Sequence, residues 1–263
     1  MGFKKSEEIA EAAMYAGCKK ADMRVSEQIP LGFAAGAFIA IGYLLAIRVT
    51  AGLPADLEWL SPLLSGAVFP IGLILCLIAG GELLTGNMMS LSMACFKGRA
   101  SIRKLAGNWF IITVGNFAGA IFIAYVFGHL GGMTEQAPYM DKIIALTQSK
   151  LDESFMHAFI SGIGCNWLVS SAVWMSYGAK DGAGKILAIW FPTMAFVALG
   201  FQHIVANMFL IPAAIFIGAA TWSDYFANFL PVYLGNSVGG GLFVAGIYYL
   251  AYSKRSSSVH DKK

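Results

Sequence analysis

The sequence predicts an all-α membrane protein with six transmembrane helices, arranged as an inverted 3+3 repeat in which helices 2 and 5 are broken. Three observations lead to this fold class. Hydrophobic residues make up 57% of the 263 residues and charged residues only 13%, about half the share usual in soluble domains. The apolar residues gather in stretches long enough to cross a bilayer. Two of these stretches are interrupted at matching positions, which indicates an internal duplication.

The N-terminal segment is charged and lacks the apolar run of a signal peptide. Within residues 4–22, apolar side chains recur at helical spacing, at Ile9, Ala12, Ala13 and Ala16. We therefore expect an amphipathic helix that lies on the membrane surface or against a neighbouring subunit.

Six apolar stretches follow, and a helix needs about 20 apolar residues to cross the hydrocarbon core of a bilayer. The stretches occupy residues 30–51, 62–95, 105–129, 155–177, 186–220 and 226–252. The second and the fifth are too long for one ordinary crossing, and each contains glycine and polar residues near its middle. These interruptions have the sequences AGGELLTGNMM (Ala79–Met89) and LGFQHIVANMF (Leu199–Phe209). They predict two broken helices.

The distribution of lysine and arginine predicts the orientation, because cytoplasmic loops carry an excess of these residues. One side of the membrane holds the two termini and the loops after the second and fourth stretches, with 15 of the 18 Lys and Arg residues. The other side holds Arg48, Lys142 and Lys150. Both termini are therefore expected in the cytoplasm.

The two interrupted stretches align with each other at a shift of 120 residues. The shift superposes Glu82 on Gln202, Asn87 on Asn207, Asn108 on Asn228, and GNFAG (Gly115–Gly119) on GNSVG (Gly235–Gly239). Each copy contains three stretches, so the second copy enters the membrane from the opposite side. We divide the single transmembrane domain, residues 1–263, into a first repeat (28–130), a second repeat (150–252) and a cytoplasmic tail (253–263).

Inverted repeats of this kind place a substrate path between the copies, where matching broken helices line it. The breaks are tolerated only where the freed backbone groups face protein or a water-filled cavity. A helix kink without a role in transport is the alternative. The GxxxG pairs, Gly115 with Gly119 and Gly235 with Gly239, predict close helix packing within or between subunits.

His203 is the first candidate for a functional side chain, because it is the only histidine in the middle of an apolar stretch. Its two protonation states interconvert near neutral pH, so it could exchange a proton with a passing ligand. The Thr85 hydroxyl in the other break can donate or accept a hydrogen bond, or cap the helix that follows. Asn87 and Asn207 are expected to brace the two breaks.

Further polar residues lie close to these breaks. Glu82 is a carboxylate within a span, and we expect it to pair with backbone amides of the break; Gln202 is its uncharged counterpart. Lys150 is either a snorkelling anchor or a charge at the outer mouth. Asn166 faces either His203 or the helix bundle.

Large apolar residues near the breaks either belong to the core or form dry rings that pass only neutral or transiently neutralised solutes. These residues are Phe69, Leu73, Leu83, Leu84, Val169 and Phe196. The sequence contains no metal-ligand cluster, no Ser-His-Asp arrangement and no nucleotide-binding fingerprint. We therefore expect neither an enzyme nor a cofactor, a bound metal or a nucleic-acid partner.

Four motifs resemble those of the formate/nitrite transporter family: AGGELLTGNMM, GCNWLVSSAVWMSYG (Gly164–Gly178), GFQHIVANMFLIPAA and LGNSVGGGLFV. The resemblance covers residues 4–252, and the chain looks most similar to formate transporters of Gram-positive bacilli. It implies a homopentamer of six-span protomers with an aquaporin-like inverted repeat. Each protomer would then have its own pore for small monovalent anions or their acids.

The resemblance also implies roles for single residues. His203 matches the central histidine, Thr85 the threonine that faces it, Asn166 the asparagine near the histidine, and Lys150 the lysine before the fourth helix. The six apolar residues named above match positions of two hydrophobic constrictions. Gln202 departs from the pattern, because many members have glutamate before the histidine.

We therefore expect a channel or transporter that moves formate across the cytoplasmic membrane of a bacterium, as the anion or as transiently protonated formic acid. In this reading the central histidine lies between two hydrophobic constrictions. Nitrite and hydrosulfide are alternative substrates within the same family. A membrane scaffold or sensor that transports nothing is the alternative from a different class.

Overall fold

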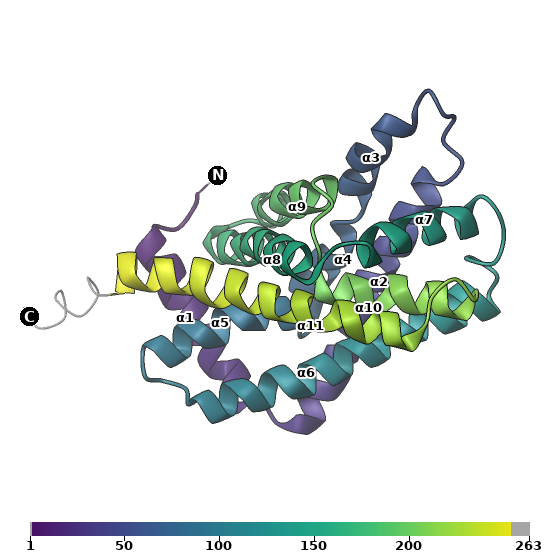
Figure 1. The fold of residues 1–263 in the computed structure, drawn as a ribbon. Helices are drawn as coiled ribbons and strands as arrows, with labels where there is room; N and C mark the ends of the chain where they lie inside the picture. The colour runs from purple at the N-terminus through teal and green to yellow at the C-terminus, as the bar shows by residue number, and fades with distance from the viewer. Residues whose placement is uncertain (1, 254–263) are drawn as a thin grey trace, which may run out of the picture.

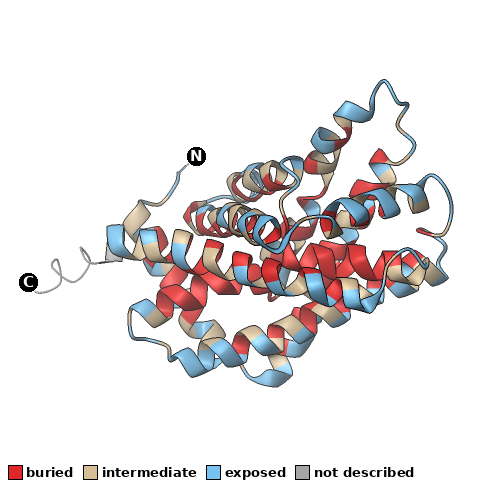
Figure 2. Ribbon diagram, viewed as in Figure 1, coloured by how far each residue is buried: buried red, intermediate tan, exposed pale blue. Residues whose placement is uncertain are grey.

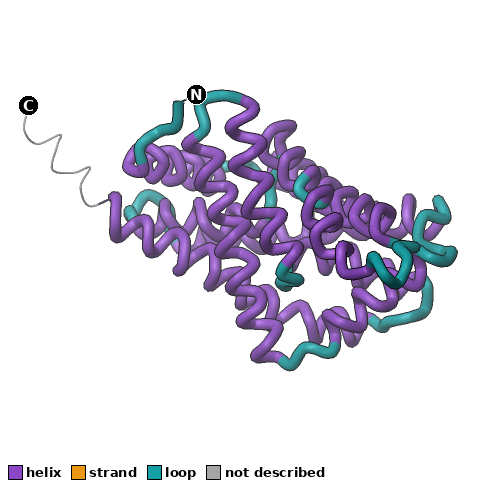
Figure 3. The backbone as a smooth tube through the Cα atoms, turned by 90° about the horizontal axis from the view of Figure 1, so that it is seen from above, coloured by secondary structure: helices purple, strands orange, loops and turns teal. Residues whose placement is uncertain are grey.

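The protein is an all-helical bundle in the computed structural model, which describes residues 2–253 (Figure 1). Helices joined by loops account for most of the described backbone when the bundle is seen from above (Figure 3). The predicted all-α class is therefore confirmed for this part of the chain. Of the tail expected at residues 253–263, residues 254–263 lie outside the described residues.

The helices follow one another along the chain with short connections. The first half contains α1 (Ser6–Asp22), α2 (Val25–Thr50), η1 (Glu58–Leu60), α3 (Ser61–Val68), α4 (Ile71–Ile74), η2 (Leu75–Gly80), α5 (Leu84–Phe96), α6 (Ile102–Phe122) and η3 (Ile123–Leu130). The second half contains α7 (Tyr139–Leu151), α8 (Phe155–Gly178), α9 (Gly182–Ala198), α10 (Ile204–Phe216), α11 (Trp222–Val238), η4 (Gly239–Gly246) and η5 (Tyr249–Ser253).

Within residues 2–253, five helical segments are long and apolar enough to cross a membrane, which makes this chain a multi-pass membrane protein. They are Val25–Thr50, Glu58–Gly80, Ile102–Leu130, Phe155–Gly178 and Trp222–Tyr252. The fifth stretch expected from the sequence, 186–220, is divided between the shorter apolar helices α9 and α10. The expected second stretch, 62–95, comprises a segment of crossing length followed by α5.

The apolar face of the N-terminal helix α1 packs against its own chain. Whether the helix also lies on the membrane surface or against another subunit stays a prediction. Its buried residues Ile9, Ala13 and Met14 form a hydrophobic cluster with Met89 of α5 and Trp174 of α8. The apolar face of α1 is therefore covered by helices of the same protomer, which stabilises the helix by removing that face from water and lipid.

Close helix pairs hold the bundle together at the glycine motifs. A Cβ atom added to Gly119 of α6 would lie 2.0 Å from the carbonyl oxygen of Phe33 in α2. A Cβ added to Gly235 of α11 would lie 2.2 Å from the carbonyl oxygen of Phe159 in α8. The GxxxG pairs therefore serve packing within one chain, because only glycine permits these backbone distances.

The short helices α5 and α10 lie enclosed among the longer ones. Leu84–Ala94 of α5 and Ile204–Ala214 of α10 are buried along their whole length, as the red ribbon in the middle of Figure 2 shows for α10. Helices enclosed on every side require apolar or internally bonded side chains all round. The polar residues on α5 and α10 therefore all need partners within the protein.

Candidate functional site

Two short nonhelical segments interrupt the apolar helices. Residues 81–83 separate η2 from α5, and residues 199–203 separate α9 from α10. A glycine in the left-handed region stands at the start of each interruption: Gly80, the last residue of η2, with φ +106°, and Gly200, the second residue after α9, with φ +73°. Residues with a Cβ rarely adopt this conformation. The N-terminal ends of α5 and α10, which follow the two segments, meet at one contact between side chains.

That contact joins Thr85 to His203. Thr85 Oγ1 lies 3.1 Å from His203 Nε2, and both side chains are buried. His203 is also the N-cap of α10, where its Nδ1 accepts the backbone N–H of Ala206 at 3.1 Å. Because an acceptor nitrogen carries no hydrogen, the neutral imidazole holds its proton on Nε2 and donates it to Thr85 Oγ1.

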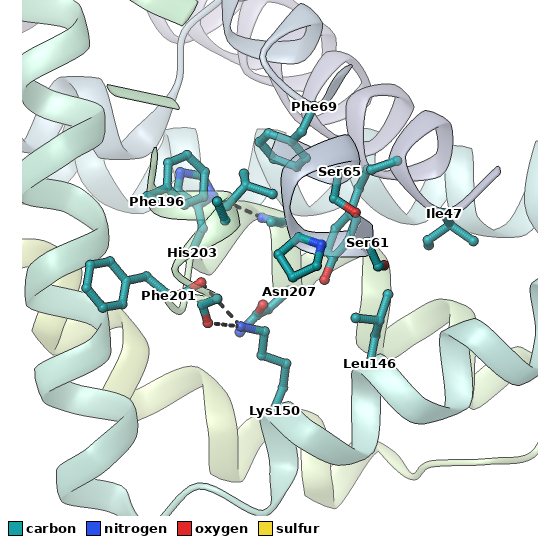
Figure 4. A pocket seen from close by; sticks show the side chains of 17 residues that line it. Ile47, Ser61, Ser65, Phe69, Leu146, Lys150, Phe196, Phe201, His203 and Asn207 are labelled. Atoms are coloured by element: carbon teal, nitrogen blue, oxygen red, sulfur yellow. Dashed lines mark hydrogen bonds between the residues drawn. The ribbon is translucent and has the colours of Figure 1, made fainter. Parts of the chain in front are cut away.

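A cavity of ≈ 180 Å³ reaches this contact from one side (Figure 4). Lys150 and His203 point toward it from different elements, and Phe69 lies across it. The other lining residues are Tyr43, Ala46, Ile47, Ser61, Pro62, Ser65, Leu146, Phe196, Val197, Ala198, Gly200, Phe201, Ala206 and Asn207. The lining is mostly apolar, with one ammonium group, one imidazole and a few hydroxyl groups.

Aromatic rings form the wall of the cavity next to His203. The rings of Phe69 and Phe196 meet edge to face with centroids 5.6 Å apart, and the Phe196 ring stacks on the His203 imidazole at 5.5 Å. Tyr43 packs edge to face on Phe69 at 5.7 Å. Phe69 and Phe196 were expected near the path, whereas sequence reasoning missed Tyr43, Ser61 and Ser65.

A much smaller cavity, of ≈ 20 Å³, lies beside the other break. It is lined by Lys20, Leu77, Gly81, Leu83, Gly86, Asn87, Ser90, Val173 and Tyr177. Ser90 Oγ and Tyr177 Oη lie 3.4 Å apart in its wall. Of the six apolar residues expected at constrictions, Leu83 lines this cavity, while Leu73, Leu84 and Val169 are buried and line neither of the two.

Asn116 of α6 holds the backbone of the first break. Its Oδ1 accepts the N–H of Leu84 at 2.9 Å, and its Nδ2 donates to the carbonyl oxygens of Glu82 and Gly32, both at 2.8 Å. The amide thereby satisfies backbone groups that the end of the helix leaves free. Asn116 is fully buried, so these bonds have no competition from water.

Asn236 of α11 repeats this arrangement at the second break. Its Oδ1 accepts the N–H of Ile204 at 3.0 Å, and its Nδ2 donates to the carbonyl oxygens of Gln202 at 3.0 Å and Gly162 at 2.9 Å. Sequence reasoning missed both asparagines. The signal was present, because Asn116 and Asn236 are the second residues of the aligned GNFAG and GNSVG motifs.

Asn87 of α5 binds other side chains near the first break. Its Nδ2 donates to Glu82 Oε2 and to Asn108 Oδ1, both at 2.9 Å. The other carboxylate oxygen, Glu82 Oε1, accepts from Lys20 Nζ of α1 at 2.6 Å. The expectation that Glu82 pairs with backbone amides is therefore wrong. Glu82 is only 7% exposed, and burying an unpaired carboxylate costs free energy. Its burial therefore favours the ion pair with Lys20.

Asn207 makes the matching bonds in the second half. Its Nδ2 donates to Gln202 Oε1 at 2.7 Å and to Asn228 Oδ1 at 2.8 Å. Gln202 Nε2 in turn donates to the backbone carbonyl oxygen of Lys150 at 3.1 Å. Gln202 is fully buried and does not line the larger cavity. It therefore holds the backbone of Lys150 without reaching the cavity itself.

Lys150 lies at the mouth of the larger cavity, outside the candidate spans. Its Nζ donates to the carbonyl oxygens of Gly200 and Phe201, as the dashed lines in Figure 4 mark. Among residues 2–253, no carboxylate oxygen lies within 4 Å of this nitrogen, although Glu153 attracts it from further away. Burial lowers the pKa of Lys150, because the charged form loses its hydration.

Asn166 of α8 faces the helix bundle and lines neither cavity. Its Nδ2 donates to the carbonyl oxygens of Asn236 at 2.7 Å and Thr85 at 3.3 Å. It thus fixes the position of Thr85 without reaching the space in front of His203.

Comparison with known proteins decides which family this chain belongs to. The formate/nitrite transporter profile matches residues 7–250. The chain is a member of the formate/nitrite transporter family. Among its relatives, the uncharacterized transporter YrhG of Bacillus subtilis is 56% identical over 263 residues, which cover 100% of this chain and 99% of the relative. The formate channel BtFdhC of Bacillus thuringiensis is 51% identical over 98% of this chain and 100% of its own length.

Solved structures of the formate/nitrite transporter family have the same fold. An "FNT family ion channel" superposes with a TM-score of 0.83 at 31% identity and covers 92% of this chain and 98% of its own. A "pentameric formate channel with formate bound" superposes with a TM-score of 0.73 at 31% identity, covering 89% and 98%. The resemblance seen in the sequence motifs is therefore confirmed, as is membership of a membrane channel family.

Proposed function

We propose that this protein is a channel that moves formate across the cytoplasmic membrane of a bacterium and catalyses no chemical conversion. One observation carries the proposal: a single, mostly apolar cavity connects a buried ammonium, Lys150, with a neutral imidazole, His203. A positive group attracts an anion, and apolar walls next to it favour a small solute that can become neutral. The name of the relative BtFdhC supports formate as the solute.

The proposed architecture is six crossings in two inverted halves, with the broken second and fifth helices meeting at the centre. The hydrogen bonds of Asn116 and Asn236, and those of Asn87 and Asn207, recur at the 120-residue shift and support a duplication. The repeat bounds 28–130 and 150–252 remain part of this proposal. The excess of Lys and Arg on one side supports cytoplasmic termini.

The proposed assembly is a homopentamer with one path in each protomer. The solved pentameric formate channel supports this number of subunits. Large apolar residues on the outer face of α6, Phe110 at 70% and Val114 at 51% exposure, need either lipid or a neighbouring subunit to cover them. In a membrane protein, lipid can cover one part of this face and a neighbouring subunit another.

In the proposed mechanism, Lys150 draws the formate anion into the larger cavity. Movement toward Phe69 and Phe196 strips water from the carboxylate, which favours the neutral acid. The apolar residues beyond, Leu83 and Leu84 among them, pass formic acid and reject the ion. Leu73 and Val169 complete the apolar lining in this proposal.

The proton in this mechanism comes from water in the cavity rather than from His203. His203 Nδ1 is occupied by the N–H of Ala206, so it can take up a proton only if the N-cap of α10 is lost. The proton on Nε2 is donated to Thr85. His203 therefore stays neutral in this mechanism, and the carboxyl group of the passing acid can form a hydrogen bond with it only where the bond to Thr85 opens.

Flux measurements in proteoliposomes test the proposal. Labelled formate should enter vesicles with the protein faster than protein-free vesicles, and more so at acidic pH, because the neutral acid is then more abundant. Parallel assays with nitrite and hydrosulfide identify the preferred substrate. Faster flux of either would reassign the substrate, and no flux of any of the three anions would favour a scaffold or sensor. Flux unchanged in His203→Phe would remove His203 from the mechanism.

A further inference from the structure

The two halves of the protein differ in charge at one pair of equivalent positions. Lys20 near the end of α1 and Lys150 near the end of α7 each offer a backbone carbonyl oxygen to an asparagine Nδ2 at 3.3 Å, from Asn108 and Asn228 respectively. Both lysine side chains reach toward the break of their own half. The two lysines are therefore structural counterparts.

The residues that support the two lysines are not equivalent. Glu82 pairs with the Lys20 ammonium at 2.6 Å, which neutralises its charge. At the matching position, Gln202 donates from Nε2 to the Lys150 carbonyl oxygen and does not contact the ammonium. The Lys150 ammonium instead donates to backbone carbonyl oxygens. Carbonyl oxygens solvate a cation but carry no net charge. Within the described part of the chain, the only carboxylate that acts on Lys150, Glu153, lies beyond ion-pair distance. Lys150 therefore keeps most of its positive field, whereas Lys20 loses most of its field to Glu82.

A glutamate at position 202 could not reproduce the bonding of Gln202. An ionised carboxylate has no hydrogen to donate, so the bond to the Lys150 carbonyl oxygen would be replaced by repulsion between two oxygens. Asn207 Nδ2 could still donate to one oxygen, as Asn87 Nδ2 does to Glu82. The other oxygen would then be free to turn to the Lys150 ammonium, as Glu82 Oε1 does to Lys20.

The cavities next to the two lysines also differ in volume, and the larger one lies next to Lys150. The cavity at Lys150 measures ≈ 180 Å³, and the cavity at Lys20 measures ≈ 20 Å³. A single water molecule fits the smaller cavity, whereas only the larger one has room for a formate ion together with water. Uncompensated charge and available space thus coincide on one side of the Thr85–His203 contact.

We propose that Gln202, because it carries no charge, leaves Lys150 without an ion-pair partner among residues 2–253, so that the pore has a single anion-binding mouth. The inference rests on the proposed formate transport and specifies its sidedness. Formate binds at low concentration from the Lys150 face and only at higher concentration from the Lys20 face. Because a passive path carries no net flux at equal concentrations, the ratio of maximal rate to half-saturation concentration is the same for both faces. At zero membrane potential and equal pH, the maximal rate from the Lys150 face is therefore lower in the same proportion as the half-saturation concentration.

The test compares the two faces in vesicles of defined orientation. Right-side-out and inside-out vesicles are prepared from the same cells, with membrane potential and pH gradient clamped at zero. Initial rates of labelled formate uptake then give a half-saturation concentration for each face. We expect the value at the Lys150 face to be lower by about tenfold, equivalent to about 1.4 kcal/mol.

Four variants separate charge from structure. Gln202→Glu should raise the half-saturation concentration at the Lys150 face and abolish the difference between faces. Gln202→Met loses the bond to the Lys150 carbonyl oxygen, as Gln202→Glu does, and also the bond from Asn207, but it adds no charge and should keep the difference. Glu82→Gln should change the value at the Lys20 face little, because the cavity there is too small for formate. The double exchange Glu82→Gln/Gln202→Glu should therefore abolish the preference and not reverse it.

A binding measurement supplies a readout that needs no transport. Line broadening of carbon-13-labelled formate by solubilised protein should be strong for the wild type and weak for Gln202→Glu. Equal half-saturation concentrations at both faces of the wild type, or an unchanged value in a folded Gln202→Glu variant, would overturn the inference while leaving formate transport intact. No formate flux at either face would overturn both proposals.

Discussion

Thr85 Oγ1 accepts a hydrogen bond from His203 Nε2 across 3.1 Å, so one side-chain contact joins the ends of α5 and α10. The direction of this bond follows from the other ring nitrogen, which accepts the N–H of Ala206. The imidazole thus has no free acceptor or donor for a second partner unless one of these bonds opens.

Replacing Thr85 by Val should destabilise the protein. The change keeps the shape of the side chain but leaves the buried His203 Nε2–H without an acceptor, at a cost of about 1–3 kcal/mol. The thermal unfolding temperature in detergent measures the effect. Thr85→Ser keeps the hydroxyl and serves as the control. A Val variant as stable as the Ser variant would contradict the assigned hydrogen bond.

Replacing His203 by Asn should preserve most of the function. Asn is among the best N-cap residues, so α10 keeps its cap, and the amide still offers a polar group to Thr85. Formate flux should remain and should still rise as pH falls, because the proton comes from water. His203→Phe loses the cap, worth about 0.5–2 kcal/mol, and should be less stable. Loss of the pH dependence in His203→Asn would instead identify the imidazole as the proton donor.

Replacing Asn116 or Asn236 by Leu should be among the most damaging single changes in the chain. Each substitution removes three hydrogen bonds and leaves buried backbone groups unpaired, at about 1–3 kcal/mol for each group. The yield of folded protein on size-exclusion chromatography and its unfolding temperature report the loss. Ser171→Ala is a suitable control, because this exposed hydroxyl bonds only to the carbonyl of Trp167 one turn earlier.

Two glycines of the same helix α6 should respond in opposite ways to alanine. Gly119→Ala places a Cβ 2.0 Å from the carbonyl oxygen of Phe33, so α2 and α6 must separate and the unfolding temperature should fall. Gly107 has no atom within 4 Å of the added Cβ. Gly107→Ala should be neutral or stabilise the helix by up to about 1 kcal/mol. Equal effects at both positions would mean that the α2–α6 distance does not depend on glycine.

The lowered pKa of Lys150 predicts a pH dependence at its own face. As pH rises through this pKa, the ammonium is lost below the usual lysine value of about 10.4, and the half-saturation concentration for formate should rise. The stability of the folded protein, in contrast, should increase as the pH rises. Between the two pKa values the unfolded chain binds more protons than the folded one, so the free energy of unfolding increases with pH.

The measurement compares the wild type with Lys150→Met from neutral pH to about pH 10. The variant has no titrating group at this position, so its half-saturation concentration should be high and constant. A rise of the same size in Lys150→Met would assign the effect to another group.

Much of the fold was predictable because membrane spans follow from hydropathy, and hydropathy is a property of neighbouring residues. The position of His203 and Thr85 at the two interruptions was also visible in the sequence, because polar residues are rare in such stretches. What was not visible depends on contacts between distant segments. The Glu82 carboxylate pairs with Lys20, which lies 62 positions away on the N-terminal helix α1.

The roles of Asn116 and Asn236 could not be predicted from the sequence for a different reason. Asn116 and Asn236 lie on α6 and α11, outside the interruptions that they support. Periodicity suggests only that they lie on helices, and their glycine neighbours suggest packing. Their role becomes clear only when the helices are placed beside the free backbone groups that these amides satisfy.

The meeting of the N-terminal ends of α5 and α10 at one contact has a consequence for cations. Each helix begins with a partial positive charge from its aligned peptide dipoles. Two such ends that face one contact disfavour hydronium and sodium ions there. Under the proposed mechanism, a proton would therefore cross only as part of the neutral acid and not as a free ion.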